Sequence, residues 1–390
     1  MVIGIVKVER IIATLLLAIA FCPYIGSTAM SAWISYGCVA VIIGCAIVKL
    51  ISTKKIAKEL HVVLWGNLTI KIIIYLYSLC LAIFGIISAS QLGTNLQTYI
   101  NSVAAVCYFY LFGDKAYRSS LVAFIVASVV TVLSQMPYGN IKVHDLSLAG
   151  GFIFINFFCL GERITKKNIK YLIVTIAVLL ISSKSISVLS LGVVSIISFV
   201  YGKLGKKEKK RLLKFCGLSF VFVIYLYVAL VIDGKFFDII ESLGIFTSGR
   251  IYYYRVAEEL ASFSVTFIGY GRNALSHLFA TKYSYMRVGN IHSDILRMYV
   301  ECGFCIFALW IYNYFSYFPR KLEKISGTRV VFSYMLCSFY LFMTYMTDNT
   351  ELYTVTQFFY IMIILECIRK EKIKTKSQEK QSNEQKVVYM

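Results

Sequence analysis

Long apolar runs separated by short polar stretches recur along almost the whole chain. Most of them hold enough residues to cross about 30 Å of lipid hydrocarbon as a helix. We therefore predict an all-α integral membrane protein with about twelve transmembrane helices. The predicted spans are residues 10–29, 32–51, 70–90, 99–113, 119–137, 147–161, 170–185, 186–202, 215–232, 295–318, 330–347 and 351–368.

These spans divide the chain into four parts. Residues 1–232 hold the first nine helices, residues 233–294 form one large extracellular loop, and residues 295–368 hold the last three helices. Residues 369–390 are expected to be a flexible cytoplasmic tail. The large loop is expected to be partly helical, because "FFDIIESL" is amphipathic and Ser248 is placed as the N-cap of a following helix.

Composition supports the membrane assignment, and the position of the charges orients the chain. Hydrophobic residues make up 58% of the 390 residues, more than one soluble core of this length can bury. The formal net charge of +20 would suggest a nucleic-acid partner in a soluble protein. Here Lys and Arg concentrate in every second loop, which is the positive-inside pattern and excludes nucleic acid. We expect a multi-pass plasma-membrane protein with both termini in the cytoplasm, attracted to anionic membrane lipid.

The start of the tenth predicted span, "GNIHSDILRMYVECGF", is unusually charged for this chain. Arg297 lies three residues after Asp294 and four before Glu301, so both carboxylates can neutralise it in lipid. Ser293 or Asp294 can cap the helix. His292 has no such structural explanation, because it precedes the helix, whose positive end disfavours imidazolium. A neutral imidazole can accept a proton, so we predict that His292 is a catalytic base.

Four cations on the predicted outer side are candidates for binding an anionic ligand. Arg250 has no acidic residue three or four positions downstream and is the strongest of them. Arg255 has two glutamates at those positions, so an ordinary surface ion pair explains it equally well. Arg272 follows "GYG", where glycines permit a tight turn beside the cation, although a plain loop turn is an equal explanation. Lys184 opposes the positive-inside pattern, which a phosphate partner explains better than simple snorkelling.

Other charged positions are given no function. Lys71 is placed at the cytoplasmic end of its span, where a lysine needs no explanation. Asp348, Asn349 and Glu351 are taken as a plain polar turn between the last two spans. The outer loops lack clustered carboxylates or thiols, so we expect no metal and no cofactor.

This arrangement resembles the O-antigen polymerase and O-antigen ligase superfamily of bacterial envelope glycosyltransferases. Those proteins have about a dozen spans, arginines in one large outer loop, and a His followed by a polar residue with a Gly ten positions after it. Here His292-Ser293 and Gly303 fit that spacing, and residues 248–250 supply the Ser-Gly-Arg of the loop. Two features depart from the pattern, because Ile306 stands where a small residue or Tyr is common, and Ser183-Lys184 replaces an earlier Ser-Arg.

The resemblance implies a substrate, an undecaprenyl-pyrophosphate-linked oligosaccharide at the outer face of the plasma membrane. Arg250 and Lys184, with Arg255 or Arg272, would then hold the pyrophosphate and stabilise its charge as it leaves. His292 would take the proton from the acceptor hydroxyl that attacks the anomeric carbon, with inversion. No metal is required, because pyrophosphate is already a good leaving group.

Polymerase and ligase share this chemistry and differ in acceptor. The Lys- and Ile-rich composition favours an AT-rich, Gram-positive source, and hence a polymerase of capsular polysaccharide, exopolysaccharide or O-antigen. A chain-length regulator and a flippase would be its partners. The alternatives are a ligase-type transferase, a flippase or transporter of the same lipid-linked sugar, and a non-catalytic scaffold. A transporter is expected to carry ionisable residues inside its helices.

Overall fold

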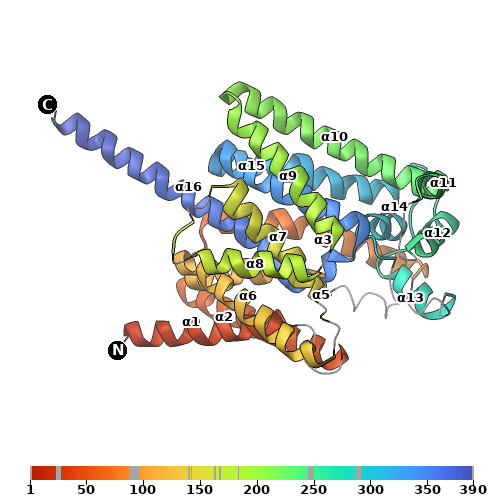
Figure 1. The fold of residues 1–390 in the computed structure, drawn as a ribbon, viewed down its shortest axis with the longest axis horizontal. Helices are drawn as coiled ribbons and strands as arrows, with labels where there is room; N and C mark the ends of the chain where they lie inside the picture. Colours follow the sequence, from red (N-terminus) through yellow and green to blue (C-terminus); the bar gives the residue numbers. More distant parts are fainter. Residues whose placement is uncertain are drawn as a thin grey trace.

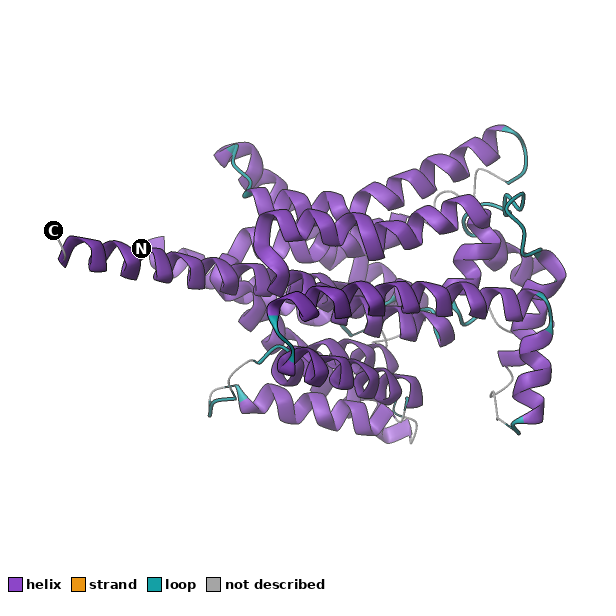
Figure 2. Ribbon diagram, turned by 90° about the horizontal axis from the view of Figure 1, so that it is seen from above, coloured by secondary structure: helices purple, strands orange, loops and turns teal. Residues whose placement is uncertain are grey.

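The apolar runs form helices, because in lipid only intra-segment hydrogen bonds satisfy the backbone, and most of them share one direction (Figures 1 and 2). The computed structural model describes residues 2–22, 28–87, 96–138, 141, 143–161, 164–166, 168–182, 184–244, 250–283, 285 and 291–388. Within these ranges the chain is predominantly helical and has no β-strand. The predicted all-α class is confirmed.

Each predicted span overlaps a different helix of at least eleven residues. These helices are α1 (Val2–Ala20), α2 (Thr28–Thr53), α3 (Lys58–Ile83), α5 (Leu96–Phe112), α6 (Ala116–Gln135), α7 (His144–Phe154), α8 (Ile169–Ser182), α9 (Ser185–Lys203), α10 (Lys206–Ile232), α14 (Asp294–Tyr312), α15 (Phe318–Thr347) and α16 (Thr354–Val388). Short helical turns are η1 (Gly113–Lys115), η2 (Met136–Tyr138), η3 (Ile155–Cys159), η5 (Asn313–Tyr317) and η6 (Thr350–Leu352). Between α10 and α14 lie α11 (Lys235–Ser242), α12 (Arg250–Leu260) and α13 (Ala274–Thr281).

Six of the described helical segments are long and apolar enough to cross a membrane. They are Trp33–Thr53, Lys58–Ile83, Thr98–Gln135, Ser185–Lys203, Lys206–Ile232 and Asp294–Thr347. Two shorter segments, His144–Cys159 and Ile169–Ser182, are also apolar. The chain therefore has the character of a helical membrane protein.

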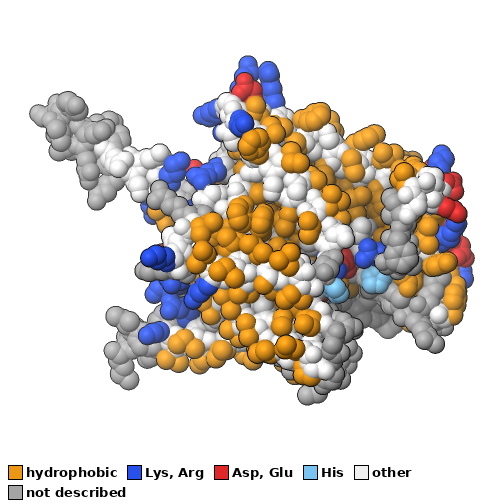
Figure 3. Space-filling model, viewed as in Figure 1, with side chains coloured by type: hydrophobic (Ala, Val, Ile, Leu, Met, Phe, Trp, Pro, Cys, Tyr) orange, Lys and Arg blue, Asp and Glu red, His pale blue; other side chains and the backbone are white. Residues whose placement is uncertain are grey.

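Large aromatic side chains fill the centre of the bundle, where α16 packs against α5, α7 and α15. The ring of Trp310 on α14 lies 4.7 Å from that of Phe342 on α15, and the ring of Phe21, just after α1, lies 5.2 Å from that of Phe358 on α16. The outer helices turn apolar side chains outward, as at Leu218, which is 72% exposed. Figure 3 shows this apolar surface across the middle of the molecule, as expected of a protein whose solvent is lipid.

The basic segments gather at one end of the bundle. Lys210 at the start of α10 pairs with Glu323 of α15 at 2.6 Å, and Lys372 of α16 pairs with Glu59 of α3 at 2.6 Å. Both chain termini lie toward the same end (Figure 1). The segment that holds α11, α12 and α13 lies at the opposite end. The alternation of basic and weakly charged segments in the sequence thus corresponds to the two ends of one bundle.

Two predicted boundaries are wrong. The span predicted at 70–90 is α3, which begins at Lys58 and places Lys71 inside the helix rather than at its end. The lysine was taken as a boundary because a cation in lipid is costly, but the fold surrounds it with polar partners. The tail predicted to be flexible from residue 369 continues α16 to Val388. Glu366, Arg369 and Lys370 supply ion pairs at helical spacing there.

Candidate functional site

His292 lies immediately before α14, at the end of the bundle opposite the basic segments. Its backbone has φ 52°, a left-handed conformation that is uncommon for a residue with a side chain. Ser293 caps α14, because its Oγ accepts a hydrogen bond from the Leu296 N–H at 3.3 Å. This capping fixes the backbone from which the imidazole projects. The ring lies 5.8 Å from that of Tyr253 on α12 and is tilted by 50° to it, so the imidazole borders α12.

Arg250 and Lys184 act on His292 from two other parts of the chain. Burial lowers the pKa of His292, and the positive charges of Arg250 and then Lys184 lower it further. Geometry places both cations in this region: Arg250 lies one helical turn before Tyr253, whose ring contacts His292. Lys184 pairs with Asp348, whose carbonyl oxygen accepts the Asp294 N–H at 3.2 Å, two residues after His292. The structure therefore brings three residues that the sequence had singled out separately into one region, where burial and two positive charges favour a neutral imidazole.

Tyrosine hydroxyls fix α12 against the end of α15. Tyr227 of α10 donates to the Met346 carbonyl oxygen at 2.9 Å, and Tyr254 of α12 donates to the same oxygen at 3.3 Å. Tyr227 also lies 3.3 Å from the Ser293 Oγ. These bonds connect the helix that carries Arg250 to the cap that follows His292. Arg250 itself is half-buried and has no ion pair among the described residues.

Lys184 stands between α8 and α9 and forms an ion pair with Asp348, which follows α15. Both side chains are largely buried, at 13% and 4% exposed. The sequence had assigned Asp348 to a plain polar turn, and that interpretation is wrong. Ser183, the other half of the predicted Ser-Lys motif, lies outside the described residues, as do Ser248 and Gly249.

Arg272 belongs to a buried ionic cluster rather than to an open loop turn. Its guanidinium donates to Glu301 at 3.1 Å and also to Glu351, and its side chain is only 6% exposed. Its backbone N–H donates to Ser78 Oγ at 3.1 Å. The Leu275 N–H donates to Glu301 at 3.3 Å. With both carboxylates bound, Arg272 is committed to the protein interior in this conformation.

Arg297 completes the cluster from α14. It donates to Asp294 at 2.5 Å and to Glu351 at 2.7 Å, while the second oxygen of Asp294 accepts the Glu351 N–H at 2.6 Å. The predicted partnership of Arg297 with Asp294 is therefore present. Its second partner is Glu351, which it shares with Arg272, whereas the predicted partner Glu301 pairs with Arg272 instead.

Lys71 is the third cation of the cluster. Its Nζ donates to the Thr98 carbonyl oxygen at 2.9 Å and to Ser102 Oγ at 2.6 Å, and it lies 4.0 Å from Glu351. Three cations thus face three carboxylates, those of Asp294, Glu301 and Glu351. The cluster is neutral as a whole, which is how six buried charges are tolerated.

Gly303 interrupts α14 with φ 71°. The segment after α12 fills the break: the Tyr270 N–H donates to the Val300 carbonyl at 3.1 Å, and the Gly271 N–H donates to that of Glu301 at 2.7 Å. The Phe304 N–H donates back to the Phe267 carbonyl at 2.9 Å. The predicted "GYGR" turn and the predicted glycine of the His-Gly spacing are therefore one packed unit, next to the ionic cluster.

Arg255 lies apart from this group. Its side chain is 57% exposed, pairs with Glu258 at 3.6 Å and covers the ring of Phe237 at 4.5 Å. About 100° of rotation per residue places Arg250 and Arg255 on different faces of α12. The surface ion pair considered for Arg255 is the arrangement in the structure.

Sequence reasoning missed Glu351, Lys71 and Asp348 as members of this region. One signal was available for Lys71: a lysine with apolar residues on both sides, "LTIKIII", requires a buried partner. Among the described residues, no three His, Cys, Asp or Glu side chains come together as metal ligands. No model of a known protein family matches the chain, and a search of curated proteins found no match.

Proposed function

We propose that the protein is a metal-independent glycosyltransferase that polymerises undecaprenyl-pyrophosphate-linked oligosaccharide repeat units at the outer face of the plasma membrane. The observation that carries the proposal is the convergence of His292, Arg250 and Lys184. In this proposal all twelve long helices cross the membrane, both termini lie in the cytoplasm, and α11 to α13 belong to one extracellular segment.

The chemistry follows from the charges around His292. Burial first, and then two cations, favour the neutral imidazole, which can accept the proton of an acceptor sugar hydroxyl. The oxygen of that hydroxyl forms a bond to the anomeric carbon as the bond from that carbon to the pyrophosphate breaks. Arg250 and Lys184 stabilise the charge that develops on the leaving pyrophosphate. Because Lys184 is already paired with Asp348, it would act mainly through the electrostatic field of its charge and by positioning neighbouring groups.

The buried cluster supports the site without entering the reaction. Arg272, Arg297 and Glu301 have carboxylate or guanidinium partners inside the protein. They hold α14 against α3 and the turn before α16, and so fix the helix whose cap precedes His292. Because a pyrophosphate would have to displace Glu301 and Glu351 to reach Arg272, we assign the ligand role to Arg250 instead.

The test compares wild type with His292→Ala and Arg250→Ala in the producing strain. Surface polysaccharide is resolved by length on a gel, and membrane levels of each variant are measured in parallel. Both variants should insert normally and leave only single repeat units. Arg255→Ala is the matched control, since it removes an arginine from the exposed face of the same helix, and it should leave long chains. Long chains in the His292→Ala and Arg250→Ala strains would show that the proposed site is wrong.

One observation favours a flippase or transporter: Lys71, Arg297 and Glu301 are ionisable residues buried within helices. Because these charges neutralise one another within the protein, a structural role explains them better than a transport role. The same gel separates the functions, because loss of a flippase removes all surface sugar, single units included. Accumulation of long lipid-linked chains would indicate a ligase-type transferase. A scaffold would tolerate both substitutions.

A further inference from the structure

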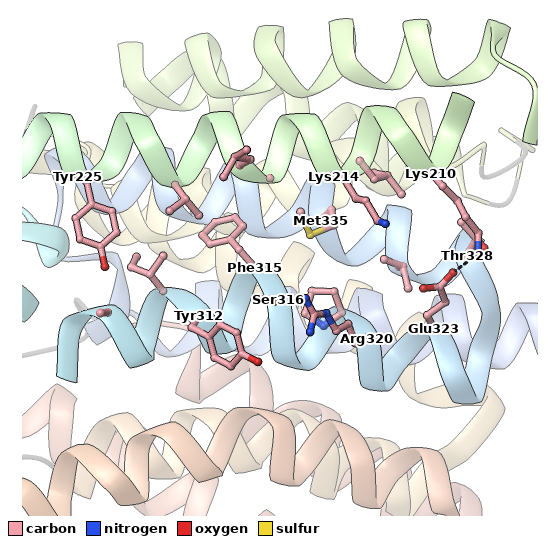
Figure 4. Close-up of a pocket in the computed structure, with 18 residues that line it drawn as sticks. Lys210, Lys214, Tyr225, Tyr312, Phe315, Ser316, Arg320, Glu323, Thr328 and Met335 are labelled. Atoms are coloured by element: carbon pink, nitrogen blue, oxygen red, sulfur yellow. Dashed lines mark ion pairs between the residues drawn. The ribbon is translucent and has the colours of Figure 1, made fainter. Parts of the chain in front are cut away.

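A cleft opens between α10 and the α14–α15 pair, and His292 is not among the residues that line it. It encloses about 590 Å³ and is lined by α10, the end of α14, η5 and α15. Figure 4 shows its two walls, with Tyr225 and Phe315 toward one end and Lys210, Lys214 and Arg320 toward the other. The cationic end coincides with the end of the bundle that carries the basic segments.

The walls of the cleft are apolar over most of their length. Leu218, Val221, Tyr312 and Phe315 contribute side chains, and Gly217 contributes none. Eleven residues separate Lys214 from Tyr225 on α10, which corresponds to about 16 Å along the helix. That depth matches one leaflet, which is about half of a 30 Å hydrocarbon core.

The mouth of the cleft has a net positive charge. Lys210 pairs with Glu323, whereas Lys214 and Arg320 have no ion pair among the described residues. Gly327 interrupts α15 with φ 78°, so that residues on both sides of the break line the cleft, Arg320 before it and Val331 after it. Two cations without a carboxylate thus stand over an apolar channel that is one acyl chain deep.

We propose that this cleft binds an anionic phospholipid from the leaflet on the side of the basic segments. The phosphate lies between Lys214 and Arg320, and one acyl chain lies along α10 toward Tyr225. The length of the cleft, its apolar walls and its positive charge together match such a lipid. A soluble phosphate would interact with the charged residues but would leave the apolar walls unoccupied. The site is independent of the function proposed above.

The test is native mass spectrometry of the purified protein in detergent, titrated with phosphatidylglycerol or phosphatidylcholine. Lys214→Gln/Arg320→Gln should weaken phosphatidylglycerol binding by roughly 30-fold, the effect of two interfacial cations. Phosphatidylcholine, whose headgroup carries no net charge, should lose less affinity than phosphatidylglycerol in this variant. The matched control is Lys207→Gln/Lys324→Gln, which removes the same charge from exposed positions outside the cleft and should change binding less than about twofold.

A second variant fills part of the cleft without changing its charge, and so tests whether the lipid lies there. Ala308→Trp places a ring on the α14 wall and should also abolish specific phosphatidylglycerol binding. Glycerol phosphate, which has no acyl chain, should not displace the lipid from the wild type.

Three results would overturn the proposal. They are equal losses in the charge variant and its control, unchanged binding in Ala308→Trp, or displacement by glycerol phosphate. A wild-type dimer that ignores phosphatidylglycerol and that Ala308→Trp dissociates would make the cleft an interface between copies of this chain, which also contradicts it.

Discussion

The backbone of Gly269 lies directly against that of Gly303. Both residues have positive φ, 77° and 71°, and a Cβ on either would collide with the backbone of the other's segment. This contact lets the chain after α12 enter the break in α14. There it forms hydrogen bonds with the backbone groups of α14 that the break leaves without helical partners, and lipid could not provide such bonds. The geometry therefore explains a glycine ten residues after Ser293 in physical terms, as a place where two backbones meet.

Gly303→Ala should destabilise the protein by about 1–3 kcal/mol, through backbone strain and the collision with Ile268. Gly192→Ala is the control, because a Cβ at this position of α9 would contact nothing within 4 Å. It should be neutral or slightly stabilising. The midpoint of thermal unfolding in detergent measures both, followed with a thiol-reactive dye on the eleven free cysteines. Equal midpoints would contradict the packed contact.

Arg250→Gln should raise the pKa of His292, because it removes a positive charge that disfavours imidazolium. Lys184→Gln should act in the same direction, and Arg255→Gln should have no effect. Nuclear magnetic resonance titration of ring-labelled histidines measures this pKa directly. The chain has only four histidines, and the signal that is lost in His292→Gln identifies His292. An unchanged pKa in Arg250→Gln would show that the two side chains do not meet.

The proposed polymerisation should persist under mildly acidic conditions. The base must be neutral, and His292 in the folded protein has a pKa below its ordinary value of 6.5. The rate should therefore stay high as the pH falls to 6.5 and decline only when the pH passes below the lowered pKa. Purified protein with lipid-linked repeat units would give this profile. A rate already halved at or above pH 6.5 would exclude a neutral base of this kind.

Glu351→Gln should destabilise the fold by about 3–5 kcal/mol, because it removes the carboxylate shared by Arg272, Arg297 and Lys71. Glu323→Gln provides the control, since its pair with Lys210 is 41% and 51% exposed and should be worth about 0.5 kcal/mol. Thermal unfolding in detergent measures the difference. Similar losses of stability in both variants would show that the buried cluster contributes no more to stability than an exposed ion pair.

The sequence predicted the helices better than the contacts between their ends. Apolar periodicity and loop charge located the long helices and their alternating ends, because lipid imposes length and charge bias directly. The cap at Ser293 and the pair of Asp294 with Arg297 were also foreseeable, since both partners lie within one helical turn.

The long-range partners were not foreseeable. Glu351 meets Arg272 and Lys71 only after α3, α14 and α16 have packed, and local spacing contains no trace of that arrangement. For the same reason Arg272 looked like a loop cation free to bind phosphate. The convergence of His292 with Arg250 and Lys184 likewise depends on helix packing, although each residue was individually recognisable by its unexplained charge.

The neutral cluster also has a consequence during biosynthesis. Lys71 enters the membrane with α3 early in translation, while its carboxylate partner Glu351 emerges only near the end of the chain. Until the last hairpin inserts, the cations at positions 71, 272 and 297 outnumber their carboxylates. A chain truncated before residue 351 would retain this imbalance, and an unpaired buried charge is costly. The charge balance of the buried cluster is therefore complete only when the last hairpin has been made.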